Sequence, residues 1–236
     1  WWHAHRAAME RILGAAGISQ DVLNLIPGII ETCRECRVWQ QPGQSVIPSI
    51  AIVTDMNVEV EADILFYRNY MAWHMVDRCD RWGAGMEITS RSTMSLCEAI
   101  DVCWLQVHGP FKILVVDGEL GISEKNKDAK QFLDRKGIKI KPKAPRQHAQ
   151  IIERRNGMVK HTMHTTEEQL KREGIPATFK QLFSEALFCC NALISNNGST
   201  PYNCRFGRQP ALLPDLHALP DDTQAGPGRY THRIRE

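Results

Sequence analysis

The sequence lacks any apolar run near the roughly 18 residues that a membrane-spanning helix needs, although 43% of its 236 residues are hydrophobic. It also lacks a charged segment followed by an apolar one, the pattern of a signal peptide, and it contains no internal repeat or low-complexity tract. These absences argue against a membrane protein or a repeat array. The composition is typical of a soluble protein with one sizeable domain and one small one.

A strong charge of either sign is missing too, since the formal net charge is only +2. Such a small excess does not by itself indicate a nucleic-acid partner, so the positions of the charges matter more. The chain has no initiator methionine and begins with Trp1-Trp2-His3, in a segment that looks structured. We therefore expect it to be a fragment of a longer protein.

Recognisable cysteine spacings are scarce. Of the eight cysteines, only Cys33 and Cys36 form a spaced pair, and the others lie in apolar runs, as buried reduced thiols do. This usage favours a reducing, intracellular compartment over a disulfide framework.

Composition divides the chain into four parts. Residues 1–42 predict a small helical domain, with one helix over Ala7–Ala16 and a second that starts at the N-cap Ser19 and is interrupted by Pro27. Residues 43–56 are predicted to be a linker, and residues 57–207 the main domain. Residues 208–236 are rich in proline and glycine, so we expect little fixed structure there.

The main domain alternates strand and helix patterns. The predicted strands are 57–67, 70–79, 83–89, 112–116 and 138–143, and the predicted helices are 92–108, 123–136, 150–173 and 179–194. Three strands followed by alternating helices and strands predict an α/β fold, with a mixed five-stranded sheet flanked by helices.

Three acidic residues fall at positions suited to chemistry. Asp63 lies among apolar neighbours inside the first strand, where an ionised side chain is costly unless it is paired or bound to a metal. Asp117 ends an apolar strand and precedes a glycine, and Glu153 lies in the first turn of the long helix. Fifty-three residues separate Asp63 from Asp117, and thirty-five separate Asp117 from Glu153.

Carboxylates brought together from separate elements suit phosphodiester chemistry. Two Mg²⁺ ions roughly 4 Å apart activate the attacking oxygen and stabilise the leaving one, and Mg²⁺ prefers oxygen ligands. Each acid also has a plainer reading: Asp117 could belong to a turn, and Glu153 could be a favourable charge at a helix N-terminus. Asp77 and Asp80 flank the second strand, and we interpret them as turn acids.

Cys33 and Cys36 can supply two thiolates to Zn²⁺, but a structural site needs four ligands. His3 lies twenty-nine residues ahead of Cys33, a separation that two short helices would close, and His5 is a second candidate. The alternative is that both cysteines are ordinary thiols after an apolar helix.

Several side chains are candidates for contacts to DNA. Glu153, Asn156, Lys160 and His164 are spaced to share one face of the long helix, so Lys160 lies two turns from the acidic site. Arg154 and Lys143 are further candidates, and Lys143 continues a strand in which Lys139 and Lys141 alternate with isoleucines. A solvated helix face and the protection of an edge strand are the alternatives.

The three acids and their spacings resemble the integrases of retroviruses and LTR retrotransposons. The likeness extends over residues 1 to about 214. Further matches are Met75-Val-Asp-Arg-Cys-Asp-Arg-Trp82, Val116-Asp-Gly118, Pro145-Arg-Gln-His-Ala-Gln-Ile-Ile-Glu-Arg-Arg-Asn156, Thr200-Pro-Tyr202 and Phe206-Gly-Arg-Gln-Pro210. The sequence departs from the family pattern at Gly118, and at Ala149 and Gln150, where the family usually has asparagine and glycine.

The resemblance implies an RNase H-like core that processes the 3′ ends of element DNA and joins them to target DNA. It implies that Asp63, Asp117 and Glu153 bind two Mg²⁺ or Mn²⁺ ions and that Lys160 contacts DNA. It also implies a zinc-binding N-terminal domain of the His-His-Cys-Cys type, in which His3 is the second histidine and the first lies before Trp1. Finally, the resemblance implies a homo-oligomer that acts on double-stranded DNA in the nucleus.

Two other functions remain open at this stage. One is an RNase H-like nuclease that only cleaves, although the zinc-type segment and Thr200-Pro-Tyr202 argue against it. The other is a DNA-binding or oligomerisation remnant of an element that has lost catalysis.

Overall fold

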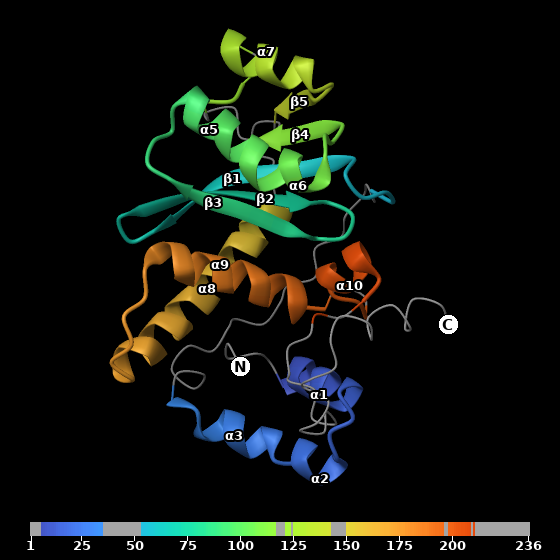
Figure 1. The fold of residues 1–236 in the computed structure, drawn as a ribbon, viewed down its shortest axis with the longest axis vertical. Coiled ribbons are helices and arrows are strands. Elements are labelled where there is room, and N and C mark those ends of the chain that lie inside the picture. Colours follow the sequence, from blue (N-terminus) through green and yellow to red (C-terminus); the bar gives the residue numbers. More distant parts are fainter. Residues whose placement is uncertain are drawn as a thin grey trace, which may run out of the picture.

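A computed structural model of the chain describes residues 6–34, 53–116, 121–123, 125–142, 150–195, 198–208 and 210. These residues form a five-stranded mixed sheet with helices on both faces, and below it a small group of helices from the N-terminal segment (Figure 1). The α/β fold predicted from the order of elements is confirmed. In the described part of the chain, no helix is both long enough and apolar enough to cross a membrane.

The sheet has the strand order β3-β2-β1-β4-β5. The strands are β1 (Glu59–Tyr67), β2 (Tyr70–Asp77), β3 (Gly83–Ile88), β4 (Ile113–Val116) and β5 (Lys139–Pro142). The first three form an antiparallel meander, whereas β4 and β5 run parallel to β1. The central strand β1 therefore has a neighbour of each kind.

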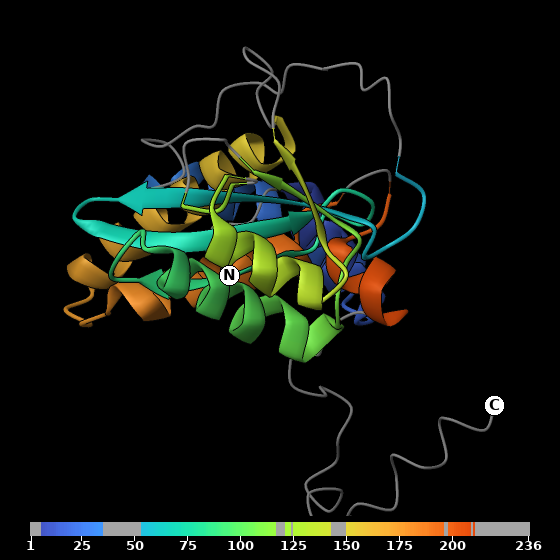
Figure 2. The same cartoon turned by 90° about the horizontal axis from the view of Figure 1, so that it is seen from above.

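Side chains alternate between the two faces of β1, as the pleat of a strand requires. Ala62 and Ile64 belong to the larger core, beneath the helical segment α5 (Thr93–Ile100), η1 (Asp101–Leu105) and α6 (Gln106–His108), and α7 (Lys127–Arg135). Viewed from above, these green helices lie in front of the strands (Figure 2). Asp63 and Leu65 face the opposite side, where α8 (Gln150–Arg172) and α9 (Phe179–Ala192) cover the sheet.

The long helix α8, predicted over residues 150–173, buries one apolar stripe. Ile152, Val159 and Met163 are fully buried, and Leu170 is partly buried on the same stripe. The helix packs this stripe against β1, β2 and α9, so burial of apolar surface holds its first turn beside the sheet.

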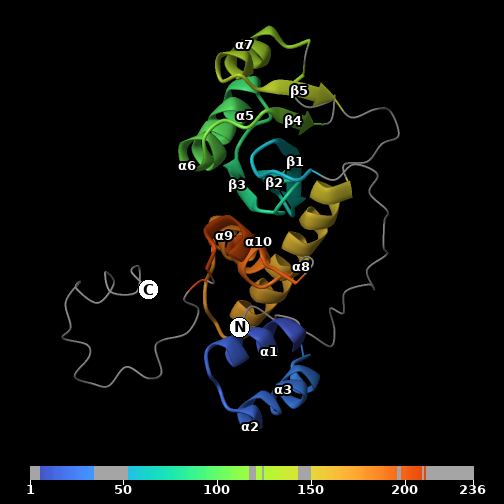
Figure 3. The same ribbon diagram turned by 90° about the vertical axis from the view of Figure 1, so that its right-hand side faces the viewer.

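The N-terminal segment contains three helices, α1 (Arg6–Ala15), α2 (Gln20–Leu23) and α3 (Ile26–Thr32). Ser19 is the N-cap of α2, as predicted. The prediction missed α3. Pro27 lies in the first turn of this helix, where its missing N–H costs nothing, so it does not break a helix here. The preceding helix, α2, already ends at Leu23. Met9 and Ile12 of α1 pack on the end of α9, where Arg11 Nη2 donates to the Leu193 carbonyl at 3.2 Å. Figure 3 shows the three helices below α8, α9 and α10.

Two helices of the core also differ from prediction. The helix predicted from residue 123 begins at Lys127, because the Asn126 side chain caps it by accepting from the backbone N–H groups of Asp128 and Ala129. A short helix, α10 (Pro201–Phe206), was not predicted at all, and the Thr200 side chain caps it. Residues 43–52 of the predicted linker and nearly all of the predicted tail lie outside the described residues.

Candidate active site

Asp63 lies in the middle of the central strand β1 and points toward α8. Its carboxylate is half-buried and accepts two hydrogen bonds from neutral groups. The Ile64 N–H donates to Oδ1 at 2.8 Å, and the Asn156 side-chain amide donates from Nδ2 to Oδ2 at 3.0 Å. The predicted burial cost is thus reduced by hydrogen bonds from both a neighbouring strand residue and the facing helix.

Glu153 lies in the first turn of α8 and is exposed. Two hydrogen bonds to β1 bracket it: the Ile152 N–H donates to Glu61 Oε2 at 3.0 Å, and Asn156 binds Asp63. These two bonds join the start of α8 to consecutive inward positions of β1. The helix turn that carries Glu153 is therefore fixed beside the strand that carries Asp63.

Glu61 is a buried acid that the sequence analysis did not select. Its second oxygen, Oε1, lies 3.2 Å from Arg78 Nε, and Arg78 also pairs with Glu59. A backbone N–H at the start of α8 and a guanidinium thus share its negative charge. Glu61 is engaged in fixing α8 to the sheet, which gives it a structural role.

Asn156 was predicted to contact DNA, and the structure places it elsewhere. Its side chain is 7% exposed, and both ends of its amide are engaged, with Nδ2 on Asp63 and Oδ1 at 2.6 Å from His74 Nδ1. A buried amide with both ends bonded is not available to a phosphate group. We therefore revise its role to orienting Asp63, a contact that helical spacing alone could not reveal.

His74 of β2 is fully buried on the same face of the sheet and is directly opposite Asp63 in the antiparallel pair. Burial lowers its pKa to about 4, and the nearby Arg155 acts in the same direction, while the bond to Asn156 opposes both. The ring is neutral near pH 7. No sequence pattern indicates a partner for His74, because that partner, Asn156, lies on a helix eighty-two residues away.

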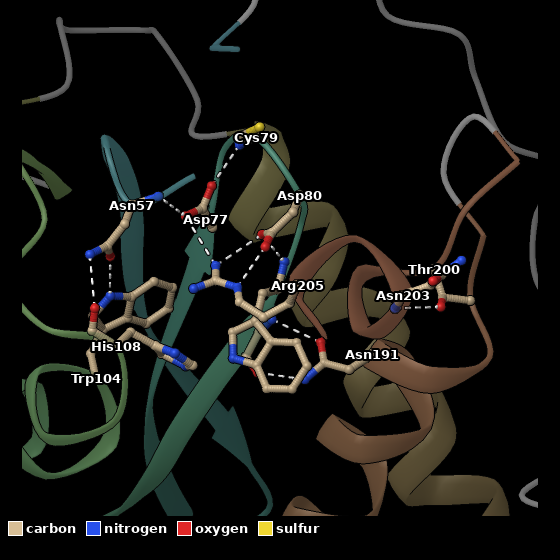
Figure 4. Close-up of polar contacts among 12 residues, drawn as sticks. Asn57, Asp77, Cys79, Asp80, Trp104, His108, Asn191, Thr200, Asn203 and Arg205 are labelled. Carbon is tan, nitrogen blue, oxygen red and sulfur yellow. Dashed lines mark hydrogen bonds and ion pairs between the residues drawn. The ribbon is translucent and has the colours of Figure 1, made fainter. Parts of the chain in front are cut away.

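A second polar cluster joins the turn after β2 to α10 (Figure 4). The Arg205 guanidinium binds Asp80 through two nitrogens, at 2.6 and 3.1 Å, and reaches Asp77 at 3.2 Å. Asp77 and Asp80 also accept from the backbone N–H groups of Cys79 and Trp82. Asp77 is the last residue of β2 and Asp80 lies in the turn that follows, which agrees with their interpretation as turn acids. Both are also buried, with an arginine as their common partner.

This cluster explains the segment Thr200–Arg208 in physical terms. The Arg205 guanidinium also lies over the rings of Trp82 and Trp104, 5.8 and 5.7 Å from their centroids. Trp82 contacts Tyr202 and Phe206 as well. Trp82 and Trp104 therefore serve packing, and α10 is held on the core by charge and by aromatic contact together.

Comparison with known proteins rests on the fold. The sequence matches no protein-family model and no curated protein. The structure is similar to the simian T-cell lymphotropic virus intasome in complex with PP2A regulatory subunit B56 gamma, with a TM-score of 0.63 and 15% identity, over 92% of this chain and 74% of that one. It is also similar to the BIV integrase catalytic core domain, with a TM-score of 0.53 and 16% identity, over 63% of this chain and 93% of that one.

A third similar structure is the catalytic core domain of HTLV-2 integrase in complex with magnesium. Its TM-score is 0.52 at 16% identity, over 62% of this chain and 94% of that one. The core of this chain has the RNase H-like fold of a retroviral integrase. The fold class implied by the resemblance is therefore confirmed.

In this integrase-like core, Asp63 and Glu153 fall on the central strand and on the helix that crosses it, as predicted. Asp117 and Lys143 lie outside the described residues. Arg154 and Lys160 are exposed on α8, open to a ligand at the surface. Arg155, between Arg154 and Asn156, is instead 2% exposed and donates from Nη2 to Asn191 Oδ1 at 2.9 Å.

His164, the last residue of the predicted helix face, belongs to another cluster. Its ring nitrogen and the carboxylates of Glu167 and Glu168 lie within 4.8 Å of one another. Arg68 and Lys171 form ion pairs with these carboxylates, at 2.7 Å and 2.9 Å. The two cations offset the negative charge that a metal ion would need, so this cluster is better explained as an ion-pair network.

The predicted zinc ligands are only partly described. Cys33 is half-buried and is the C-cap residue of α3. His3, His5 and Cys36 lie outside the described residues. Zinc binding by this segment stays a prediction.

Proposed function

We propose that this chain is a retrotransposon integrase that processes the 3′ ends of element DNA and joins them to target DNA. The observation that carries the proposal is the double attachment of α8 to β1. The bonds Ile152–Glu61 and Asn156–Asp63, each 3.0 Å long, hold the Glu153 turn against the Asp63 strand. An accessible pair of carboxylates on these two elements suits metal-assisted phosphodiester chemistry.

The position of β4 supports Asp117 as the third carboxylate. This strand pairs in parallel with β1, and Glu61 of β1 is opposite Val115 of β4. β4 ends at Val116, beside the strand that carries Asp63, and Asp117 is the next residue in the sequence. We therefore propose Asp117 as the third ligand.

The donor set fits magnesium. Carboxylate oxygens are the ligands that Mg²⁺ prefers, and Asp63 is half-buried while Glu153 is exposed, so both are open to an ion from the surface. Asp63, Asp117 and Glu153 would hold two Mg²⁺ or Mn²⁺ ions, which would polarise the phosphodiester and lower the pKa of a bound water or hydroxyl. The residues around them then act as supports: Asn156 directs the Asp63 carboxylate, and Glu61 fixes the helix N-terminus.

Binding of double-stranded DNA is the next part of the proposal. Exposed Lys160 and Arg154 extend from the same helix as Glu153, and Lys143 follows β5. Cations close to the metal site would contact phosphates near the bond that reacts. Because the similar HTLV-2 cores are described as dimeric and trimeric, we propose a homo-oligomer, working on DNA in the nucleus.

A strand-transfer assay on a short duplex tests the enzymatic proposal. Metal-dependent joining is expected with Mg²⁺, lost when the ion is chelated, and abolished in Asp117→Asn. Asp101→Asn is the matched control, because Asp101 is a surface acid on the opposite helical layer. Full activity in Asp117→Asn would end the proposal. Cleavage without joining would indicate a nuclease, and duplex binding without cleavage would indicate a non-catalytic remnant.

Zinc binding by residues 1–42 is a separate proposal, which rests on Cys33, Cys36 and His3. A chain extended upstream of Trp1 should bind one zinc ion per molecule, and the substitution Cys33→Ser should release it. Metal analysis of the purified protein measures this directly. An extended chain that contains no zinc would exclude the site without affecting the carboxylate proposal.

A further inference from the structure

His74 is connected to Asp63 through a single intermediate side chain. The imidazole Nδ1 lies 2.6 Å from Asn156 Oδ1, and Asn156 Nδ2 lies 3.0 Å from Asp63 Oδ2. His74 and Asn156 are 0% and 7% exposed. These contacts lead from His74 on β2 to Asn156 on α8, and from there to Asp63 on β1. Both His74 and Asn156 are shielded from water.

The chemistry of these groups fixes the direction of both hydrogen bonds. A carboxylate only accepts hydrogen bonds, so Asp63 requires the NH₂ end of the Asn156 amide. The amide oxygen then points to His74 and requires a donor, so Nδ1 must carry the proton. If that donor were removed, the amide could turn and present its oxygen to the Asp63 carboxylate, replacing an attraction with a repulsion.

Packing alone does not explain a histidine at this position. The ring meets Phe183 edge-on, with 6.3 Å between the ring centroids, and Gly83 on the next strand leaves room for it, since a Cβ there would lie 3.2 Å from His74 Nε2. An apolar side chain of similar size would fill the same space without burying polar nitrogens. Burial of an imidazole is costly unless its hydrogen bond has a use.

We propose that His74 is a positioning residue for the metal-binding carboxylate Asp63, and that it acts by fixing the orientation of the Asn156 amide. This inference rests on the proposed function, since positioning matters only if Asp63 binds metal. It adds to that function a residue on β2, outside the acidic trio and the long helix. His74 supports the ligand without touching metal or DNA, as outer-shell groups do in other metal sites.

Two substitutions at position 74 separate donation from volume. His74→Leu keeps much of the volume but has no donor, whereas His74→Asn retains an N–H group the same number of bonds from the backbone as Nδ1. We expect His74→Leu to lower the affinity for Mn²⁺ and the kcat of strand transfer by about 10- to 100-fold, with little change in the KM for DNA. His74→Asn should recover most of both.

A neighbouring position controls for loss of stability. Met75→Leu alters the same strand, but its side chain points to the opposite core. It should lower the melting temperature without changing Mn²⁺ affinity. Equal Mn²⁺ affinities in wild type, His74→Leu and His74→Asn, each measured below its melting temperature, would overturn the inference.

The wild-type protein offers a test that needs no substitution. Nitrogen-15 NMR of the imidazole should find His74 neutral near pH 7 with the proton on Nδ1. A proton on Nε2 alone would overturn the inference, because the amide oxygen of Asn156 would then have no donor. If wild type shows neither Mn²⁺ binding nor strand transfer, the proposed function fails, whereas activity that is insensitive to both position-74 substitutions removes only the role of His74.

Discussion

The protein contains two clusters of acidic residues at the strands β1 and β2, and their neighbours differ. At the end of β2, Asp77 and Asp80 are buried and share one guanidinium, that of Arg205. In the middle of β1, Asp63 is half-buried and takes its two described hydrogen bonds from a backbone N–H and a neutral amide. The first cluster is closed to solvent, and the second remains open to it.

Acids of the same type thus have different roles in the two clusters. A buried carboxylate paired with arginine is costly to disturb, because either partner alone is an uncompensated charge. Burial raises the pKa of Asp77, and the neighbouring Asp80 raises it further, while Arg205 opposes them. Asp63 is only half-buried, and Glu153 in the first turn of α8 is exposed. The first arrangement stabilises the fold, and the second is the one that we propose to bind a metal ion.

The largest expected effect is on catalysis at the open cluster. Asp63→Asn should lower strand transfer by on the order of a thousand-fold, because a neutral amide is a poor Mg²⁺ ligand and several kcal/mol of charge stabilisation would be lost. The melting temperature should change little. A large loss of strand transfer with an unchanged melting temperature would show that the open cluster serves catalysis and not stability. Retained activity in Asp63→Asn would show that the two clusters do not differ in this way.

The next effect is on stability at the closed cluster. Arg205→Met removes the only cation that we describe on Asp77 and Asp80, and it should lower the free energy of unfolding by about 3 kcal/mol. Denaturant titration measures this loss. Turnover per folded molecule should stay close to wild type at low temperature. A variant as stable as wild type would show that the arginine contributes nothing to the fold.

A smaller effect concerns DNA affinity beside the open cluster. Lys160→Ala should weaken duplex binding severalfold and reduce the slope of log affinity against log salt by about one. Lys171→Ala is the control on the same helix, because Lys171 pairs with Glu167 and Glu168. Fluorescence anisotropy at several salt concentrations distinguishes them. Identical slopes for both variants and wild type would remove Lys160 from the interface.

The smallest effect is a pH dependence at the closed cluster. Burial lowers the pKa of His108 to about 4 from its ordinary 6.5, with Arg205 acting in the same direction. Between these pH values the unfolded chain binds a proton that the folded chain does not, so stability should fall as the pH drops from 6.5 to 4. His108→Phe should reduce the slope of stability against pH. Part of the slope should remain, because the pKa of buried His74 is also lowered to about 4. An unchanged slope in thermal melts would contradict the assignment.

Patterns of apolar residues predicted most of the fold. All five strands and the helices α1, α5, α7, α8 and α9 were expected near their observed positions, because periods of two and 3.6 residues follow from local geometry. The helices α3 and α10 were missed. The first turn of α3 contains Pro27, which was interpreted only as a break. The helix α10 is too short to show a periodicity, and contacts made by its Arg205 and Phe206 hold it on the core.

The sequence was enough to predict the fold class and to place Asp63 on a strand and Glu153 on a helix. The hydrogen-bond and ion-pair partners of the acids could be seen only once the chain was folded. The bonds from Asn156 to Asp63 and His74, and from Arg205 to Asp80, span between 82 and 125 residues. Such partners carry no local periodicity, because hydrogen-bond direction and burial depend on how distant segments pack, and no spacing along the chain encodes that.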